Sequence, residues 1–248
     1  MIICVFRFEN NDQILIFFYA YSAYNRGSNG IGKAISLKLA EQKITVVNAD
    51  IIAPEMSNNY LIYRNCDVTQ GKDVDDLFLW MSKNTGLPDV LILNAGRGIH
   101  EKLTEGDPEK WFDVIQVNVM GALRFIRAFV PPMQIKKQGK IIFISSVAAD
   151  KIYSYGGVYS ATKAALEVIA ETLRAETDSA INITVIRAGI TDTDFFKNHP
   201  AKTANAIGQG SLHPMDIAEE IWNVINKREG AQIQKITIIP KEQSFLNI

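Results

Sequence analysis

The chain has 248 residues, with 26 basic and 27 acidic side chains and a formal net charge of −1. Hydrophobic residues make up 47% and charged residues 21%, which is ordinary globular usage and excludes a disordered or collagen-like chain. The balanced charge gives no electrostatic basis for a nucleic-acid partner or a membrane partner, and we expect neither.

The N-terminal residues 1–13 precede the first strong element and form an extra segment, either an edge strand over Ile2–Phe8 or a disordered start. The apolar run Ile14–Ala23 is shorter than the ~18 residues that a membrane span needs. It follows acidic and amide residues instead of the cationic segment typical of a signal peptide. We therefore expect a core strand here and a cytoplasmic protein.

Short apolar runs then alternate with longer helical patterns, which is typical of βαβ units around a parallel sheet. The expected strands are Ile14–Ala23, Ile44–Ala49, Tyr60–Asn65, Asp89–Leu93, Lys140–Ser145, Asn182–Ile186 and Lys235–Ile239. The expected helices are Gly30–Gln42, Val74–Lys83, Pro108–Val130, Val158–Asp178 and Pro214–Lys227. The pattern predicts a single α/β domain over residues 14–248. It is a Rossmann-type, doubly wound parallel sheet of about seven strands in three α/β/α layers.

A glycine-rich turn joins the first strand to the first helix. Glycines in this context let a backbone approach a pyrophosphate, which helix N-terminal amides bind. The candidate cofactor-binding residues are Gly27, Ser28, Asn29, Gly30, Ile31 and Gly32. Glycines at such a connection also serve turns alone, so the motif needs support from elsewhere in the chain.

Asp50 supplies that support, because it ends the second strand eighteen residues after Gly32. A carboxylate there accepts the adenosine-ribose hydroxyls and repels a 2′-phosphate, which predicts NAD in preference to NADP. The alternative for Asp50 is a turn or helix-cap residue. Further candidates end the third and fourth strands, namely Asp67 with Val68, and Asn94 with Ala95 and Gly96. A helix cap and a tight turn are the alternatives for these two groups.

Tyr159 and Lys163 are four residues apart on a predicted helix, so both side chains lie on one face. A nearby ammonium stabilises a phenolate, so we expect the pKa of Tyr159 to fall toward the range useful for proton transfer. The spacing alone is weak evidence, since Tyr60 and Arg64 repeat it in a predicted strand.

The order of these motifs resembles the short-chain dehydrogenase/reductase family over about residues 19 to 240. Ser146, which closes the fifth strand, and Asn118, inside the preceding helix, complete the family's series, and Gly189, Ile190 and Thr193 follow the sixth strand. The resemblance implies an oxidoreductase that interconverts an alcohol and a carbonyl compound. Tyr159 would be the acid/base, Ser146 would bind the substrate oxygen, and Lys163 would lower the tyrosine pKa and bind the nicotinamide ribose.

The resemblance also implies roles for the remaining candidates. Asn118 would hold a water that links Lys163 to solvent. Asp67 would lie near the adenine, and Asn94 and Gly96 beside the cofactor. Ile190 and Thr193 would contact the nicotinamide carboxamide. A homodimer or homotetramer through helices 108–130 and 158–178 would follow the family's habit.

Two positions depart from the family pattern. Arg26 stands where the turn usually has its first glycine, and Ala188 stands where a proline usually precedes Gly189. A protein with an impaired cofactor site that serves as a binding or scaffold protein is therefore the second hypothesis. The substrate is not readable from the sequence, and a lid over residues 194–212 is expected to select it. The three histidines lack the spacing of a zinc site, so no metal is expected.

Overall fold

The apolar runs of the chain form one parallel sheet in the computed structural model, which describes residues 14–19 (backbone), 30–54, 58–151, 153–179, 181–193, 195, 210–228 and 230–241. The strands are β1 (Ile14–Tyr19), β2 (Thr45–Asp50), β3 (Leu61–Asn65), β4 (Val90–Leu93), β5 (Lys140–Ser146), β6 (Asn182–Ala188) and β7 (Lys235–Ile238). Their order across the sheet is β3-β2-β1-β4-β5-β6-β7, and every neighbouring pair is parallel. The order reverses between β1 and β4, and such switch points are where open α/β sheets bind ligands.

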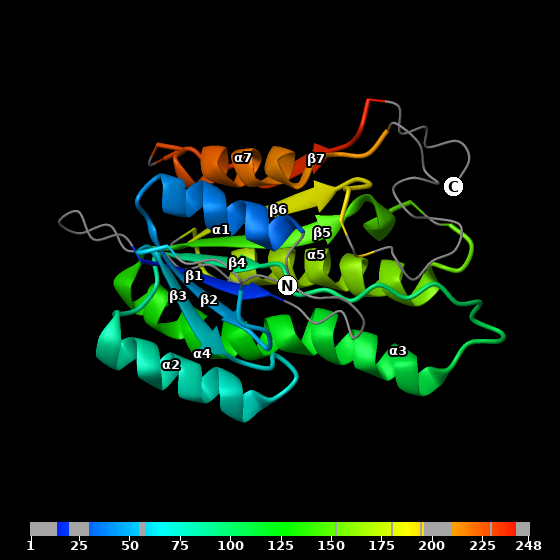
Figure 1. The fold of residues 1–248 in the computed structure, drawn as a ribbon, viewed down its shortest axis with the longest axis horizontal. Coiled ribbons are helices and arrows are strands. Elements are labelled where there is room, and N and C mark those ends of the chain that lie inside the picture. Colours follow the sequence, from blue (N-terminus) through cyan, green and yellow to red (C-terminus); the bar gives the residue numbers. More distant parts are fainter. Residues whose placement is uncertain are drawn as a thin grey trace.

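Helices cover both faces of this sheet (Figure 1). The helices α1 (Ile31–Glu41) and α7 (Pro214–Ile225) pack on one face. The helices α2 (Gly71–Asn84), α4 (Gly121–Lys136) and α5 (Gly157–Glu176) pack on the other. The short helix α3 (Pro108–Ile115) leads into α4. These layers confirm the predicted three-layer, doubly wound fold.

Strand β5 shows why the central strands are apolar almost throughout. Ile141 and Phe143 are fully buried against α4 and α5, whereas Ile142 and Ile144 are buried against α1 and α7. Successive side chains of a strand point to opposite faces, so a strand covered on both sides needs apolar residues at every position. The two faces together make the hydrophobic core.

The predicted helix Pro108–Val130 was wrong in its continuity and in its end. Five residues of π-helix, η1 (Gln116–Met120), interrupt it between α3 and α4. Helix α4 also continues through Pro131 and Pro132 to Lys136. Prolines inside a helix cost roughly 3 kcal/mol each, but Val130 and Met133 are buried on either side of them, and their packing keeps the helix intact.

The run Pro108–Lys136 has the length and hydropathy of a membrane-crossing helix, with a mean hydropathy of 1.3 in its most apolar window. Of that window 44% is buried inside the protein, mainly against the sheet. A helix that packs on the core of a domain is apolar for the same reason, so this run needs no membrane to explain its composition.

Other boundaries differ by a few residues. Helix α2 begins at Gly71 instead of Val74, and Asp50 is the last residue of β2 instead of the residue after it. Several expectations fall outside the described residues: the extra segment 1–13, the end of the first strand at 20–23, the turn residues Gly27, Ser28 and Asn29, and most of the lid at 194–212. These stay predictions.

Candidate active site

Tyr159 and Lys163 lie on the face of α5 that packs against the sheet, near the carboxyl end of β5. Their exposures are 7% and 4%. The Lys163 ammonium nitrogen is 5.8 Å from the centre of the Tyr159 ring. The four-residue spacing thus brings the two groups together as expected, in a setting from which water is almost excluded.

The end of β5 holds both side chains in place. The Ser146 side chain lies close enough to the Tyr159 hydroxyl to oppose the rise of its pKa. Lys163 donates from Nζ to the carbonyl oxygen of Ile144 at 2.9 Å. The end of one strand therefore lies against two residues of one helix, with Ser146 beside Tyr159.

Asn118 lies in the π-helical segment η1 and is fully buried. Its Oδ1 accepts from the Arg97 amide at 2.7 Å, and its Nδ2 donates to the Arg97 carbonyl at 3.1 Å and to Thr162 Oγ1 at 2.9 Å. Thr162 in turn donates to the carbonyl oxygen of Tyr159 at 2.7 Å. π-Helical turns are frequent at functional sites, and here the turn ties the segment after β4 to the helix that carries Tyr159.

At Gly96 the backbone of that segment comes close to the side chains of Lys163 and Asn118. A Cβ at this position would lie 3.3 Å from Lys163 Nζ and 3.8 Å from Asn118 Oδ1. A side chain would therefore press on Lys163, which explains the glycine. Asn94 and Gly96 are half-buried and Ala95 is fully buried, so all three lie beside the site that the sequence predicts.

The expected fall in the tyrosine pKa was wrong for the protein without a ligand. Burial raises the pKa of Tyr159, and the nearby Tyr153 raises it further, while the hydrogen bond from Ser146 opposes the rise. Burial also lowers the pKa of Lys163 to about 8. The two shifts have one cause, since desolvation penalises the charged form of each group. The sequence argument counted the charge of Lys163 and could not count the desolvation.

One helical turn beyond Lys163, Glu167 joins α5 to three strands. Its carboxylate accepts from Arg187 Nε and Nη2, each at 2.7 Å, from Lys235 at 2.9 Å and from the Ser145 hydroxyl at 2.9 Å. Burial opposes ionisation of Glu167, but the hydrogen bonds from Arg187, Lys235 and Ser145 hold its pKa below the ordinary value. Arg187 also pairs with Asp150.

Asp50 lies at the carboxyl end of β2, on the far side of the switch point, and is 3% exposed. Its Oδ1 accepts from the Ile52 amide at 3.1 Å. Burial raises its pKa to about 7, although the Ile52 hydrogen bond opposes the rise. The carboxylate that the sequence predicts is therefore partly protonated near neutral pH in the absence of a ligand.

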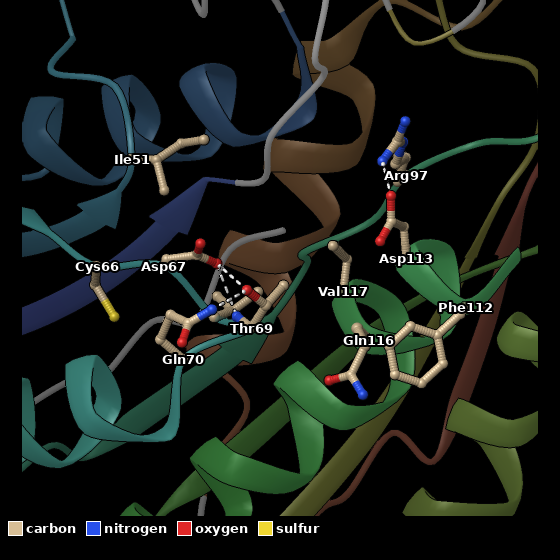
Figure 2. A pocket seen from close by; sticks show the side chains of 11 residues that line it. Ile51, Cys66, Asp67, Thr69, Gln70, Arg97, Phe112, Asp113, Gln116 and Val117 are labelled. Carbon is tan, nitrogen blue, oxygen red and sulfur yellow. Dashed lines mark hydrogen bonds and ion pairs between the residues drawn. The ribbon is translucent and has the colours of Figure 1, made fainter. Parts of the chain in front are cut away.

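A cavity of about 560 Å³ opens beside Asp67 at this edge of the sheet (Figure 2). It is lined by Ile51, Cys66, Asp67, Val68, Thr69, Gln70, Arg97, Phe112, Asp113, Gln116 and Val117. Asp67 and Thr69 lie on one side and Val117 on the other (Figure 2). Arg97 pairs across the rim with Asp113 at 3.4 Å.

Asp67 is tied into the turn that begins the connection to α2. Its Oδ1 accepts from the amide and the hydroxyl of Thr69, both at 2.8 Å, and its own amide donates to Asp73 at 2.9 Å. The carbonyl oxygen of Val68 accepts from Arg124 at 3.1 Å. The helix-cap alternative of the sequence analysis was wrong for Asp67, because Gln70 is the N-cap of α2 and the Asp67 side chain bonds within the preceding turn, where it also lines the cavity.

The start of α1 supplies donors for an anion. Gly30 is its N-cap with φ 143°, a backbone conformation that other residues rarely adopt, and no side chain caps the first turn within the described residues. The amides of Ile31 and Gly32 belong to that turn, so their hydrogens have no helical acceptor. The positive end of a helix dipole adds to the attraction for a phosphate.

The residues after β6 complete this edge. Gly189 donates its amide to Ile238 at 2.7 Å, and the carbonyl of Ile190 accepts from Leu212 at 2.8 Å. The Thr193 hydroxyl accepts from the Phe195 amide at 3.3 Å. These bonds hold the segment close to the carboxyl end of β6, on the side of Tyr159.

The arrangement fits a dinucleotide laid across the switch point. Helix α1, which starts at a glycine and has no side-chain cap among the described residues, suits a pyrophosphate. Asp50 and the nearby cavity suit an adenosine. Gly96 has no side chain to fill the space beside Lys163, near Tyr159. The site therefore has the parts to bind a nicotinamide dinucleotide and to move a proton beside it.

Several residues were missed by the sequence analysis. Glu167 continues the spacing of Tyr159 and Lys163 by four more residues, which was a readable signal, but its partners Arg187 and Lys235 are on other strands. Arg97 follows Gly96 directly and lines the cavity, yet nothing in its neighbours marks it. Tyr153 lies close enough to raise the pKa of Tyr159, and only the fold shows this.

Comparison with known proteins gives consistent results. A family model described as short chain dehydrogenase matches residues 26–204. An uncharacterised oxidoreductase of Staphylococcus aureus is 29% identical over 220 residues, which are 86% of this chain and 93% of the relative. The solved closed form of a serine dehydrogenase complexed with NADP⁺ has a TM-score of 0.81 at 24% identity, covering 88% of this chain and 94% of that one. An alcohol dehydrogenase of Thermococcus sibiricus complexed with 5-hydroxy-NADP has a TM-score of 0.73 at 23% identity, covering 87% and 94%.

Proposed function

The chain belongs to the short-chain dehydrogenase family, and on this premise we propose that it interconverts a secondary alcohol and a ketone with a nicotinamide dinucleotide as its hydride carrier. The observation that carries the proposal is the meeting of Ser146, Tyr159 and Lys163 at one edge of the sheet, with the Lys163 ammonium nitrogen 5.8 Å from the centre of the Tyr159 ring. When bound, the nicotinamide would supply the hydride.

The side chains of the protein would handle the substrate oxygen and its proton. In reduction Tyr159 donates its hydroxyl proton to the carbonyl oxygen, so that ketone, hydride and proton together give the alcohol. In oxidation the same oxygen takes the proton back. Ser146, which lies near the Tyr159 hydroxyl, would donate to the substrate oxygen and hold it in line. Lys163 would stabilise the tyrosinate and bind the nicotinamide ribose.

Asn118 would act as a positioning residue. Both ends of its amide are used by Arg97 and Thr162, so it fixes the backbone beside Gly96 and the turn of α5 that carries Tyr159. The water relay that the family resemblance implies for Asn118 stays part of the proposal.

We further propose that the cofactor is NAD. A 2′-phosphate on the adenosine ribose would meet the carboxyl of Asp50, which is buried at the end of β2. Two arginines of this region are committed elsewhere: Arg64 stacks 4.2 Å over the Trp80 ring, and Arg97 pairs with Asp113. The NADP complexes named above are structures of other proteins. At 23% and 24% identity they support a shared fold and do not determine which cofactor this chain binds.

The partner that we propose is a second copy of the chain. Apolar side chains are exposed on neighbouring elements of one face, among them Ile115 at 41%, Met120 at 36% and Val168 at 65%. Exposed apolar surface of this kind is typical of an interface. Light scattering at micromolar concentration should give the mass of a dimer or tetramer, and a monomer mass would contradict this proposal.

The proposed activity is tested by titrating the protein with NADH, followed by fluorescence, and by measuring NADH oxidation with a panel of ketones. We expect binding and turnover. Binding without turnover on any ketone or alcohol, or no binding at all, would favour the alternative of a scaffold protein with an impaired cofactor site.

A further inference from the structure

The ring of Phe195 lies over the proposed acid/base. Its centroid is 5.6 Å from that of Tyr159, with a 57° angle between the planes. Phe195 also packs on the backbone of Gly98, where a Cβ would lie only 2.7 Å from the ring. The ring therefore contacts both the proposed acid/base and the backbone of the segment after β4.

Tyr153 forms a second aromatic wall near Tyr159. It lies six residues earlier in the chain, and its proximity raises the pKa of Tyr159. The ring of His100 lies 6.0 Å from the Tyr153 ring at an angle of 38°. Gly156 lets Tyr153 adopt this position, since a Cβ there would meet its ring at 2.2 Å.

Leu103 supplies the third side. Its side chain packs on Gly157, whose Cβ would lie 3.0 Å from it, and it remains 63% exposed. Phe195, Tyr153, His100 and Leu103 are here called the aromatic recess. Three glycines, at 98, 156 and 157, bring these side chains against the backbone around Tyr159.

The charged residues near Leu103 are committed to one another. Glu101 accepts from the Trp111 indole at 3.0 Å and the Asp107 amide at 3.0 Å. Lys102 pairs with Glu105 at 2.7 Å. The recess thus presents rings and an aliphatic side chain, while the charges of the same loop hold the start of α3.

We propose, resting on the function proposed above, that the aromatic recess selects ketones and secondary alcohols with a planar apolar substituent, such as an aryl group. A phenyl substituent would stack against Phe195 and Tyr153 and lose its hydrated surface between them. A small aliphatic substituent would leave part of this surface uncovered. A carboxylate substituent would be desolvated beside the rings of Phe195 and Tyr153.

The test compares kcat/KM for an aryl methyl ketone, an aliphatic methyl ketone and a 2-oxo acid, with saturating NADH, in the wild type and four variants. Phe195→Ala removes the ring, and Phe195→Leu keeps apolar bulk without planarity. Gly98→Ala does not change the Phe195 side chain itself, but the added Cβ would push its ring away from the backbone of residue 98. Ile135→Ala, at a side chain that is 84% exposed on α4, is the control.

We expect the wild type to prefer the aryl ketone by about tenfold or more, a ratio in the range that one hydrophobic pocket achieves. Phe195→Ala and Gly98→Ala should lower that ratio by about tenfold, and Phe195→Leu by less. Ile135→Ala should keep it. Calorimetric titration of the aryl and aliphatic ketones into the NAD⁺ complex, which has no hydride to give them, provides the same comparison without turnover.

Equal efficiency on the aryl and aliphatic ketones, or a preference for the 2-oxo acid, would overturn this inference and leave the proposed function standing. So would a ratio that Phe195→Ala and Gly98→Ala do not change. Absence of turnover on every ketone would overturn the proposed function itself.

Discussion

The two halves of the sheet are prepared to different degrees. On the side of β5 and β6, the groups around Tyr159 are bonded to one another, with Lys163 on Ile144, Asn118 on Arg97 and Thr162, and Glu167 on Arg187. On the side of β2 and β3 lies a cavity of about 560 Å³, next to a buried carboxyl whose pKa is raised to about 7. The half that would perform chemistry is cross-linked by hydrogen bonds among its own residues, whereas the half that would bind adenosine contains a cavity.

The difference has a physical reason. Catalytic groups must be held in position before the reaction, because reorganising them during the reaction raises the barrier. A binding half can gain its last interactions from the ligand. Substitutions in the first half should therefore affect turnover or folding, and substitutions in the second half should affect affinity.

The largest effect is expected from Tyr159→Phe. Loss of the hydroxyl removes the proton donor, so kcat should fall by at least about 10²-fold. The Kd for NADH should stay within about twofold, since the ring and its packing remain. Turnover is measured by loss of NADH absorbance and binding by fluorescence. A variant that keeps its turnover would show that another group moves the proton.

Glu167→Ala should break the strand-to-helix network of the catalytic half. It leaves Arg187 and Lys235 without their carboxylate in a partly buried place, which should cost about 2–4 kcal/mol in the free energy of unfolding. Urea unfolding measures this. The matched control is Arg127→Ala, whose pair with Asp75 is exposed on both sides and should contribute less than about 1 kcal/mol.

If Glu167→Ala and Arg127→Ala lower the stability equally, the network has no special role. Glu167→Gln sharpens the result, because it keeps the shape and part of the hydrogen bonding while it removes the charge. It should lie between the wild type and Glu167→Ala.

In the binding half, the protonation of Asp50 should make the affinity for NADH depend on pH. A carboxylate at Asp50 accepts ribose hydroxyls better than the neutral acid, so NADH binding must remove its proton. With a pKa of about 7, the affinity should rise about tenfold from pH 6 to pH 8. Asp50→Asn should abolish the rise and narrow the preference for NADH over NADPH. A rise that persists in Asp50→Asn would assign it to another group.

A further effect is expected in the pH dependence of the free energy of unfolding. Because the folded state raises the pKa of Asp50 above its ordinary 3.8, the folded state holds the proton more tightly than the unfolded chain. This contribution is complete below about pH 4 and is lost as the pH rises through about 7. Between pH 4 and pH 7 the urea midpoint of the wild type should therefore fall relative to that of Asp50→Asn. A difference that does not change with pH would contradict the raised pKa.

The sequence by itself determined the fold and much of the site. Strands that are buried on both faces must be apolar at every position, so Ile141–Ile144 marked the sheet. The helical repeat placed Tyr159 beside Lys163, and the carboxyl ends of parallel strands gathered Asp50, Asp67, Asn94 and Ser146 on one edge. These relations follow from local geometry and chain order.

Only the tertiary structure decided the rest, because it depended on contacts between distant segments. The pKa of Tyr159 moved opposite to the expectation, since burial and the nearby Tyr153 raise it more than Ser146 lowers it. Helix α4 continued through Pro131 because its neighbours Val130 and Met133 are buried. The Glu167 network joins α5, β5, β6 and β7, and Phe195 reaches Tyr159 from the end of β6. Desolvation and packing are properties of the assembled core, and no spacing within the chain records them.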